Sequence, residues 1–366
     1  RKDCLFCKED IHISYLAGAD EVLLIAEALD TQTLEEMMWL AKEYRMQVLC
    51  EVHSRKALAK VLSLNVLPTA IGINSRDLKT FQVDPSVPFR LRPFIPRNIK
   101  AVYESGVSEP FLNRLIGNAG FDAVLVGESV VKDAERVRLI KNFVNEFNRG
   151  AQEIPNYFTK LYNLKRDIIV KICGITNIED AWRAYSLGAD VLGFVLTSSP
   201  RKTDLKFIAS LSKLNVLKVV VVGDIGKDKL TELSALIKQG VIDGVQFHCC
   251  KTPEVVHAFG GNAYRAIVLK SLADFKHEKF IPQVLYDASK TVAKTKGKLI
   301  PANLRKHLQG GWIAGGLNPG NIKKLISQIK PQLVDVSSGV EKEPGKKDEA
   351  KLERFIQGVR NAKVFW

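Results

Sequence analysis

Short apolar runs recur along this sequence, and the segments between them carry polar residues at helical spacing. From residue 168 onward eight such runs, several rich in β-branched residues, read as strands that are covered on both faces. We predict these strands at Ile168–Ile172, Val191–Leu196, Val216–Val222, Gly244–His248, Tyr264–Leu269, Gln283–Tyr286, Trp312–Ala314 and Leu333–Val336. Intervening segments such as Ile178–Leu187 and Leu230–Ile237 have helical spacing. Eight strand–helix units in about 200 residues predict a (β/α)8 barrel.

The first 150 residues show the same alternation with fewer strands. We predict strands at Val22–Ile25, Val48–Val52, Ala70–Asn74, Lys100–Glu104 and Ala123–Val126, with a strand fragment at Arg1–Asp3. Five strands and a fragment cannot close an eight-stranded barrel, and the chain begins with Arg1 instead of methionine. We therefore expect the natural polypeptide to extend beyond Arg1, by two strands, their helices and most of a third strand. The expected fold class is α/β, with two tandem (β/α)8 TIM barrels of which the first is incomplete.

A boundary between the two halves is expected after the helix-like run Ala134–Phe147. Gly150 and Pro155 follow this run, and both residue types interrupt regular structure. We therefore predict a partial barrel at 1–150, a linker at 151–166 and a complete barrel at 167–366.

Composition places the chain among ordinary globular proteins, with 46% hydrophobic and 26% charged residues in a length of 366. No apolar run approaches the roughly 20 residues that span a bilayer, so no membrane partner is expected. No signal peptide is visible, so we expect a cytoplasmic protein. Cys4 and Cys7 form a lone C-x-x-C, with no second pair or histidines at metal spacing. We therefore expect reduced thiols and no metal.

The formal net charge of +14 narrows the range of partners. Lysines are dense around Lys290–Lys306 and Lys342–Lys351, where they are either solvated on helix faces and loops or attract anionic small molecules. Nucleic acid is disfavoured as a partner, because the basic residues lack interleaved aromatic residues or a known nucleic-acid-binding motif.

Reactive side chains stand where predicted strands of the second half end, which is where parallel barrels keep their active sites. Cys173 ends the first of these strands and Asp287 follows the sixth. Cys173 is either a small buried hydrophobe or a thiolate base whose pKa is lowered by nearby cations. Asp287 is either a helix cap or turn residue, or an acid. A base and an acid across one barrel mouth would suit proton transfer at a sugar carbon and a sugar oxygen.

Small residues follow two later strands and are candidates for phosphate binding, namely Gly315, Gly316, Ser338 and Gly339. Open turns of glycine and serine present backbone N–H groups to an anion, aided by a helix N-terminus. The same residue types are common in ordinary turns, so the pattern by itself leaves both roles open.

Several segments of the second half together resemble phosphoribosylanthranilate isomerase over about residues 167–366. These segments are Lys171–Asn177, Gly188–Phe194, Ser198–Arg201, Val245–His248, Gly315–Asn318, Val334–Glu341 and Pro344–Asp348. The resemblance implies an Amadori rearrangement of an aminoaldose phosphate into an aminoketose phosphate. It implies that Cys173 is the general base and Asp287 the general acid for the ring oxygen. Arg201 would hold the anthranilate carboxylate, His248 and Asp335 would line the pocket, and the glycine and serine turns would hold the phosphate.

Three points about this resemblance stay open. His248 is also compatible with a satisfied histidine inside the barrel. The family usually carries a glycine-serine-glycine run followed by Lys or Gln after strand six, where this chain has Thr295–Leu299. The glycine that follows the family's histidine is Cys249 here. Both differences bear on loop closure and turnover, and neither removes the acid or the base.

Polar residues also stand at strand ends of the first half, namely Lys2, Glu51, Asn74, Arg76, Glu104, Ser105, Gly127 and Glu128. A lysine and two carboxylates at one barrel mouth suit acid–base chemistry, although salt bridges at a barrel rim would use the same residues. Five segments resemble indole-3-glycerol-phosphate synthase, in that family's order, over about residues 1–147. They are Arg1–Asp3, Glu51–His53, Gly72–Leu78, Glu104–Gly106 and Leu125–Glu128.

The synthase resemblance implies that Lys2 is a general acid and Glu51 an acid–base carboxylate. The implied substrate-binding residues are Asn74, Arg76 and Glu104, and the implied phosphate-side residues are Ser105, Gly106, Gly127 and Glu128. The implied reaction closes an indole ring on an anthranilate-derived ribulose phosphate, losing carbon dioxide and water, and it needs no cofactor. The family also uses a glutamate and a lysine on its first strand, at positions before Arg1. We therefore expect the chain as given to lack synthase activity.

Together the two resemblances imply a bifunctional tryptophan-biosynthesis enzyme that acts on phosphorylated anthranilate-derived small molecules, without cofactor, nucleic acid or membrane. One alternative is an isomerase whose first half is a structural remnant. Another is a non-catalytic barrel that binds a phosphate ligand or nucleic acid. The joint presence of Cys173, Asp287 and Arg201 favours an enzyme, because a binding protein needs no proton-transfer pair.

Overall fold

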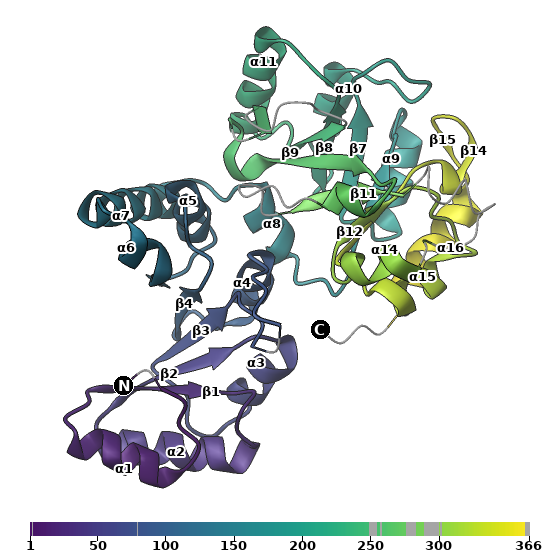
Figure 1. Cartoon of the computed structure of the whole chain (residues 1–366). Coiled ribbons are helices and arrows are strands. Elements are labelled where there is room, and N and C mark those ends of the chain that lie inside the picture. The colour runs from purple at the N-terminus through teal and green to yellow at the C-terminus, as the bar shows by residue number, and fades with distance from the viewer. Residues whose placement is uncertain are drawn as a thin grey trace. The chain divides into compact units, whose positions relative to one another are not determined.

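The computed structural model describes the chain except residues 2, 79, 249–254, 257, 276–282, 289–299, 301 and 363–366. The chain separates into two compact units, one formed by Arg1–Pro155 and the other beginning at Asn156 (Figure 1). Among the helices of these described residues, none has the length and apolar character needed to cross a membrane.

The first unit is a parallel sheet of five strands in the order β1-β2-β3-β4-β5, with helices between successive strands (Figure 1). The strands are β1 (Glu21–Ile25), β2 (Gln47–Val52), β3 (Ala70–Asn74), β4 (Lys100–Glu104) and β5 (Ala123–Leu125). The helices are α1 (Lys8–Leu16), α2 (Thr31–Glu43), α3 (Arg55–Leu62), α4 (Ser86–Leu91), α5 (Pro110–Asn118), α6 (Glu128–Lys132) and α7 (Arg136–Gln152). This arrangement agrees with an incomplete barrel, and each of the five predicted strands is confirmed to within one residue at either end.

Of the expected strand fragment at Arg1–Asp3, the structure describes Arg1 and Asp3, whereas Lys2 lies outside the described residues. Neither Arg1 nor Asp3 is in a strand. The carbonyl oxygen of Arg1 nevertheless accepts a hydrogen bond of 3.1 Å from the N–H of Leu23 in β1. The backbone of Arg1 therefore lies alongside the edge of this sheet.

The second unit is a closed barrel of eight parallel strands, with the ring order β10-β11-β12-β13-β6-β7-β8-β9. Its strands are β6 (Ile169–Cys173), β7 (Val191–Val195), β8 (Leu217–Val222), β9 (Gly244–His248), β10 (Ala263–Val268), β11 (Val284–Asp287), β12 (Trp312–Ala314) and β13 (Leu333–Val336). All eight were predicted to within one residue at either end. Most apolar positions of these short runs are buried, as expected for strands between an interior and a helix layer.

Helices cover the outside of the barrel, and most of them lie between successive strands in the sequence (Figure 1). They include α9 (Ile178–Ser186), α10 (Leu205–Ser210), α11 (Lys227–Lys238), α14 (Ala302–Arg305), α15 (Ile322–Ile329) and α16 (Glu349–Arg360). Asn177 begins α9 by accepting a hydrogen bond of 2.8 Å from the N–H of Asp180. After α9 the chain turns through Gly188, whose φ of +98° suits glycine, and enters β7.

One further helix, α8 (Tyr157–Asn163), closes the barrel at the end where its strands begin. Tyr157 stacks on Tyr264 with ring centroids 5.7 Å apart, and Phe158 packs on Trp312 at 5.7 Å. Both partners stand at or near the start of their strands. The range 151–166, expected as a linker, therefore contains the end of α7 and the whole of α8. With one end of the barrel filled by aromatic rings, the opposite end is left for a site.

A small antiparallel hairpin follows the last barrel strand, after the 3-10 helix η5 (Ser338–Val340). It consists of β14 (Glu341–Glu343) and β15 (Lys346–Lys347). Gly345 turns the hairpin with a φ of +83°, and its carbonyl oxygen accepts a hydrogen bond of 2.5 Å from the hydroxyl of Thr176. The hairpin is thereby fixed to the loop that follows β6.

Candidate active site

An ion pair lies buried in the barrel below the ends of β6 and β13. Lys171 and Asp335 are opposite one another in the strand register, and Nζ of Lys171 lies 2.5 Å from Oδ2 of Asp335. The same Nζ donates a hydrogen bond of 2.5 Å to Oε1 of Gln246, which also accepts one of 3.0 Å from the hydroxyl of Tyr264. The Lys171 side chain is fully buried. Residues of four strands thus share one polar network inside the barrel.

The charges of this network act on one another strongly. Burial lowers the pKa of Lys171, but the Asp335 carboxylate, Cys173 and Tyr157 together outweigh burial, so the pKa is raised overall. Burial raises the pKa of Asp335, Lys171 offsets part of the rise, and the Asp287 carboxylate adds to it. Among the described residues, Oδ1 of Asp335 has no hydrogen-bond partner. Asp287 and Asp335 are therefore within electrostatic reach, and one oxygen of Asp335 is left as an acceptor.

Cys173 is the last residue of β6, two positions after Lys171 and hence on the same side of the strand. Burial raises the pKa of its thiol, while Lys171 and Lys347 lower the pKa in part. The cations act in the direction expected from the sequence, but burial wins and the pKa is above its usual value. Gly193, opposite Cys173 on β7, leaves room for the thiol, because a Cβ there would lie 2.8 Å from Sγ.

Asp287 is the last residue of β11, on the far side of β12 and β13 from β6 in the barrel ring. The register pairs Asp287 with Ala314, and Ala314 with Asp335. The carbonyl oxygen of Asp287 accepts a hydrogen bond of 2.8 Å from the N–H of Leu269. Cys173 and Asp287 thus end two separate strands at the same end of one barrel.

Arg201, the predicted carboxylate ligand, is already paired with a carboxylate of the chain. Its Nε lies 2.9 Å from Oε1 of Glu341, and its Nη2 lies 2.7 Å from Oε2. This two-point contact raises the pKa of Arg201, and Cys173 also contributes to the rise. Gly174 has a φ of +77°, and a Cβ there would lie 2.7 Å from Cδ of Arg201. A glycine after Cys173 therefore lets the Arg201 side chain pack against the backbone at this strand end.

The two small-residue turns lie together at the ends of β12 and β13. Gly315 and Gly316 both have positive φ, of +87° and +70°. The carbonyl oxygen of Gly316 accepts a hydrogen bond of 2.8 Å from the side chain of Asn321, the residue before α15. Gly339, beside Ser338 in η5, packs so closely that a Cβ would lie 1.8 Å from the carbonyl oxygen of Leu317. The structure thus brings the four predicted phosphate-binding residues into adjoining turns.

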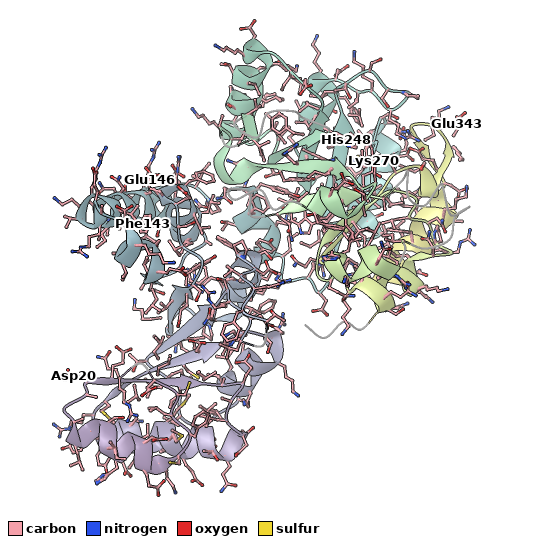
Figure 2. All side chains as sticks on the ribbon, viewed as in Figure 1. Asp20, Phe143, Glu146, His248, Lys270 and Glu343 are labelled. Carbon is pink, nitrogen blue, oxygen red and sulfur yellow. The ribbon has the colours of Figure 1, made fainter. Side chains whose placement is uncertain are left out.

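His248 ends β9 and is partly exposed (Figure 2). It stands two residues after Gln246 on the same strand, so both face the same side. The two departures noted in the sequence, Cys249 and Thr295–Leu299, lie outside the described residues.

In the first unit, predicted site residues meet at the ends of β2, β3 and β4. The side-chain amide of Asn74 donates a hydrogen bond of 3.0 Å to Oε1 of Glu51. Glu104 is fully buried and opposite Asn74 in the register. Gly72 makes room for Glu104, because a Cβ on Gly72 would lie 1.7 Å from its Oε1. Lys2, the fourth predicted member, lies outside the described residues.

His53, which follows Glu51 by two residues, joins this cluster to Glu27. Its Nδ1 lies 3.3 Å from Oε2 of Glu27, and its Nε2 lies 3.2 Å from Oε1 of Glu51. Burial lowers the pKa of His53, but the two carboxylates outweigh it and raise the pKa to about 9. Burial raises the pKa of Glu51, yet His53 and Asn74 lower it overall. The cluster therefore holds Glu51 ionised beside an imidazolium.

The remaining residues predicted in the first unit occupy the neighbouring loops. Nη2 of Arg76 lies 3.7 Å from Oε2 of Glu128, an exposed residue at the start of α6. Ser105 and Gly106 both have positive φ, of +65° and +71°, and turn the chain after β4. Gly127 directly precedes α6, and a Cβ there would meet no atom within 4 Å. These loops follow β3, β4 and β5, at the same edge of the sheet as Glu51.

Sequence reasoning missed several polar residues that the structure places around the predicted ones. They are Glu27, His53, Lys171, Gln246, Glu341 and Lys347. The available signal was a charged or amide residue inside an apolar strand, as in Val170-Lys171-Ile172 and Val245-Gln246-Phe247. Such a residue has to be paired when it is buried. Nothing in the local sequence, however, says with which residue it pairs.

Both halves of the chain match known protein families. Residues 170–358 match the model of N-(5′-phosphoribosyl)anthranilate isomerase, and residues 1–143 match that of indole-3-glycerol phosphate synthase. The isomerase of Magnetococcus marinus is 36% identical over 53% of this chain and 95% of its own length.

Two relatives match almost the whole chain. The "Multifunctional tryptophan biosynthesis protein" of Schizosaccharomyces pombe is 26% identical over 98% of this chain, and the match covers 50% of that protein. The "Tryptophan biosynthesis protein TrpCF" of Helicobacter pylori is also 26% identical over 98% of this chain, and the match covers 75% of its length. The chain thus spans about half of the yeast protein and three quarters of the bacterial one.

Proposed function

This chain belongs to the N-(5′-phosphoribosyl)anthranilate isomerase family, and we propose that its barrel catalyses the rearrangement for which that family is named. The substrate is an aminoaldose phosphate carrying an anthranilate carboxylate, and the product is the corresponding aminoketose phosphate. The supporting observation is that a thiol beside buried cations, a carboxylate and two adjoining glycine turns share one barrel end. We propose the cytoplasm as the place of action.

The proposed reaction uses one acid and one base. Asp287 gives its proton to the ring oxygen of the sugar, the bond from that oxygen to C1 breaks, and the nitrogen lone pair forms a C1=N double bond. Cys173, as thiolate, removes the proton from C2, and the electron pair moves to C1 and nitrogen to give an enolamine. Proton return to C1 and loss from the C2 hydroxyl complete the ketone. The positive charge on nitrogen favours the thiolate, which burial alone disfavours.

The other residues bind and orient the substrate. Arg201 pairs with the anthranilate carboxylate through guanidinium N–H groups that its contact with Glu341 does not use. The turns of Gly315, Gly316, Ser338 and Gly339 hold the phosphate through backbone N–H groups. Oδ1 of Asp335 accepts a hydrogen bond from a sugar hydroxyl, and His248 lines the pocket. This chemistry draws on no cofactor.

We propose indole-3-glycerol-phosphate synthesis as the activity to which the first unit contributes. Glu51 would act as an acid–base carboxylate, Lys2 as general acid, and Asn74, Arg76 and Glu104 would position the substrate. Support comes from the family match of residues 1–143 and from the contact between Asn74 and Glu51. The competing proposal, a remnant without activity, predicts no indole-glycerol-phosphate formation even when further N-terminal strands are added.

The isomerase proposal is tested with the purified chain and N-(5′-phosphoribosyl)anthranilate. Wild type should form the aminoketose phosphate, and Cys173→Ala or Asp287→Ala should lower kcat by about 100- to 10,000-fold, the usual contribution of acid–base catalysis. Circular dichroism should report an unchanged fold in both variants. Cys4→Ala, at an exposed cysteine of the first unit, is the control and should keep full activity. Wild-type rates in both barrel variants would refute the roles of these residues.

A further inference from the structure

A second buried ion pair lies on the hairpin that follows the last barrel strand. Nζ of Lys347 lies 2.9 Å from Oε1 of Glu341, and both side chains are almost fully buried. The same Nζ donates a hydrogen bond of 2.6 Å to the carbonyl oxygen of Cys173. Lys347 thus joins the hairpin directly to the residue proposed as the base.

The other partner of this pair reaches Arg201. Glu341 accepts from Arg201 at both carboxylate oxygens and from Lys347 at Oε1, and the N–H of Gly345 donates to Oε1 at 3.4 Å. Arg201 and Lys347 each lower the pKa of Glu341 against the effect of its burial. The carboxylate is therefore fixed as an anion between two cations.

We infer that Glu341 and Lys347 are positioning residues that couple the carboxylate-binding arginine to the base of the same site. Glu341 fixes the guanidinium of Arg201 in one orientation beside the mouth, and Lys347 fixes the backbone at Cys173 while placing a cation near its thiol. Neither residue touches the substrate. The role of Arg201 in this inference rests on the proposed function. The hydrogen bond from Lys347 to the carbonyl oxygen of Cys173 does not depend on it.

A two-point contact explains why a carboxylate is needed at position 341. The guanidinium is a planar fork, and a carboxylate that accepts at both oxygens sets its plane as well as its position. An amide at this position could accept at one atom only, so Glu341→Gln keeps the size and loses the orientation. The expected loss is selective for the part of the substrate that Arg201 holds.

The first experiment compares two substrates in Glu341→Gln: N-(5′-phosphoribosyl)anthranilate and the aniline analogue that lacks the carboxylate. We expect kcat/KM for the first to fall about tenfold, mainly through KM, since hydrogen bonds to charged groups are worth about that much. The analogue should change less than about twofold. Glu341→Asp should restore part of the loss. Equal losses for both substrates, or no loss for either, would overturn the role of Glu341.

The second experiment measures how fast iodoacetamide alkylates Cys173 as a function of pH, and it needs no turnover. In Lys347→Gln the amide can still donate to the Cys173 carbonyl, but the cation is gone. The alkylation midpoint should then move to higher pH, with Lys171, Asp335 and Arg201 unchanged around the thiol. An unchanged midpoint in a folded variant would overturn the role of Lys347. Should this variant not fold, the substrate comparison in Glu341→Gln decides the inference.

The hairpin itself provides the matched control. Glu343 and Lys346 form an ion pair of 2.6 Å on the same two strands, but both side chains are exposed and Glu343 projects away from the barrel (Figure 2). Glu343→Gln should leave both substrates and the alkylation midpoint unchanged, and an effect as large as that of Glu341→Gln would count against the inference. Wild type without isomerase activity would refute the proposed function, while the alkylation profile would still test Lys347.

Discussion

Removing the buried ammonium of Lys171 should destabilise the barrel strongly and in a pH-dependent way. Lys171→Met keeps most of the side-chain volume but leaves Asp335 buried without its ion-pair partner at 2.5 Å. Breaking a buried pair from one side costs about 3–5 kcal/mol, because the remaining charge has no compensation. With an m-value of about 3 kcal/mol/M, the midpoint of urea unfolding should fall by about 1–1.7 M.

The sign of the pH dependence follows from Asp335. Its pKa is already raised by burial, and loss of Lys171 removes the main influence that lowers it. Above the raised pKa the buried carboxylate stays charged and the full cost applies. As the pH falls through that pKa the folded state takes up a proton before the unfolded state does, so the loss shrinks. The deficit should therefore be larger at pH 8 than at pH 5.

The assay is urea unfolding in a Trp39→Phe/Trp366→Phe background, in which the two remaining tryptophans, Trp182 and Trp312, belong to the barrel. Lys171→Met/Asp335→Leu should recover much of the lost stability, because it leaves no unpaired charge. Lys229→Met, which removes an exposed pair with Glu232, should cost no more than about 1 kcal/mol. A Lys171→Met barrel as stable as wild type at pH 8 would refute the reasoning.

Three further predictions concern the thiol, a glycine turn and the imidazolium. Because burial raises the pKa of Cys173, iodoacetamide should alkylate it at pH 7 far more slowly than the exposed Cys4, with the rate rising at alkaline pH; peptide mass spectrometry measures both. Gly339→Ala would force a Cβ to 1.8 Å from a carbonyl oxygen, so KM for the isomerase substrate should rise at least about tenfold. Gly226→Ala is the control and should leave KM unchanged, because a Cβ at Gly226 meets no atom within 4 Å. The pKa of His53 is about 9, so its contribution to stability is present below about pH 6.5 and is lost as the pH rises through 9. NMR titration of the His53 ring should give this midpoint, and a midpoint near 6.5 would contradict the ion pairs.

The strands could be predicted closely because most of them are short apolar runs that are buried on both faces. In the predicted strand Val216–Val222, for example, four β-branched residues in succession (Val219–Val222) favour a buried strand. The helix α8 was missed, because Tyr157, Phe158 and Tyr162 look like an isolated aromatic patch until the start of β10 is seen beside them. Its burial depends on contacts with residues about a hundred positions away.

The candidate site could be predicted only in part. Strand ends identify Cys173 and Asp287 as candidates, since a parallel barrel gathers all such ends at one mouth. The partners Glu341 and Lys347 could not be deduced, because a two-point ion pair across 140 residues leaves no local periodicity. The direction of the pKa shift of Cys173 could not be predicted from the sequence either, because it depends on how far burial outweighs two cations.

We claim that a thiol and a carboxyl group of the barrel face one substrate, whose phosphate lies on the glycine turns. The most direct measurement is a crystal structure of the chain with a non-reactive reduced analogue of the aminoketose phosphate. We predict the phosphate at Gly316 and Gly339, the anthranilate carboxylate at Arg201, and Cys173 and Asp287 on opposite sides of the sugar chain. An analogue bound with its phosphate away from the glycine turns, or with neither Cys173 nor Asp287 in reach of the sugar carbons and oxygens, would contradict the claim.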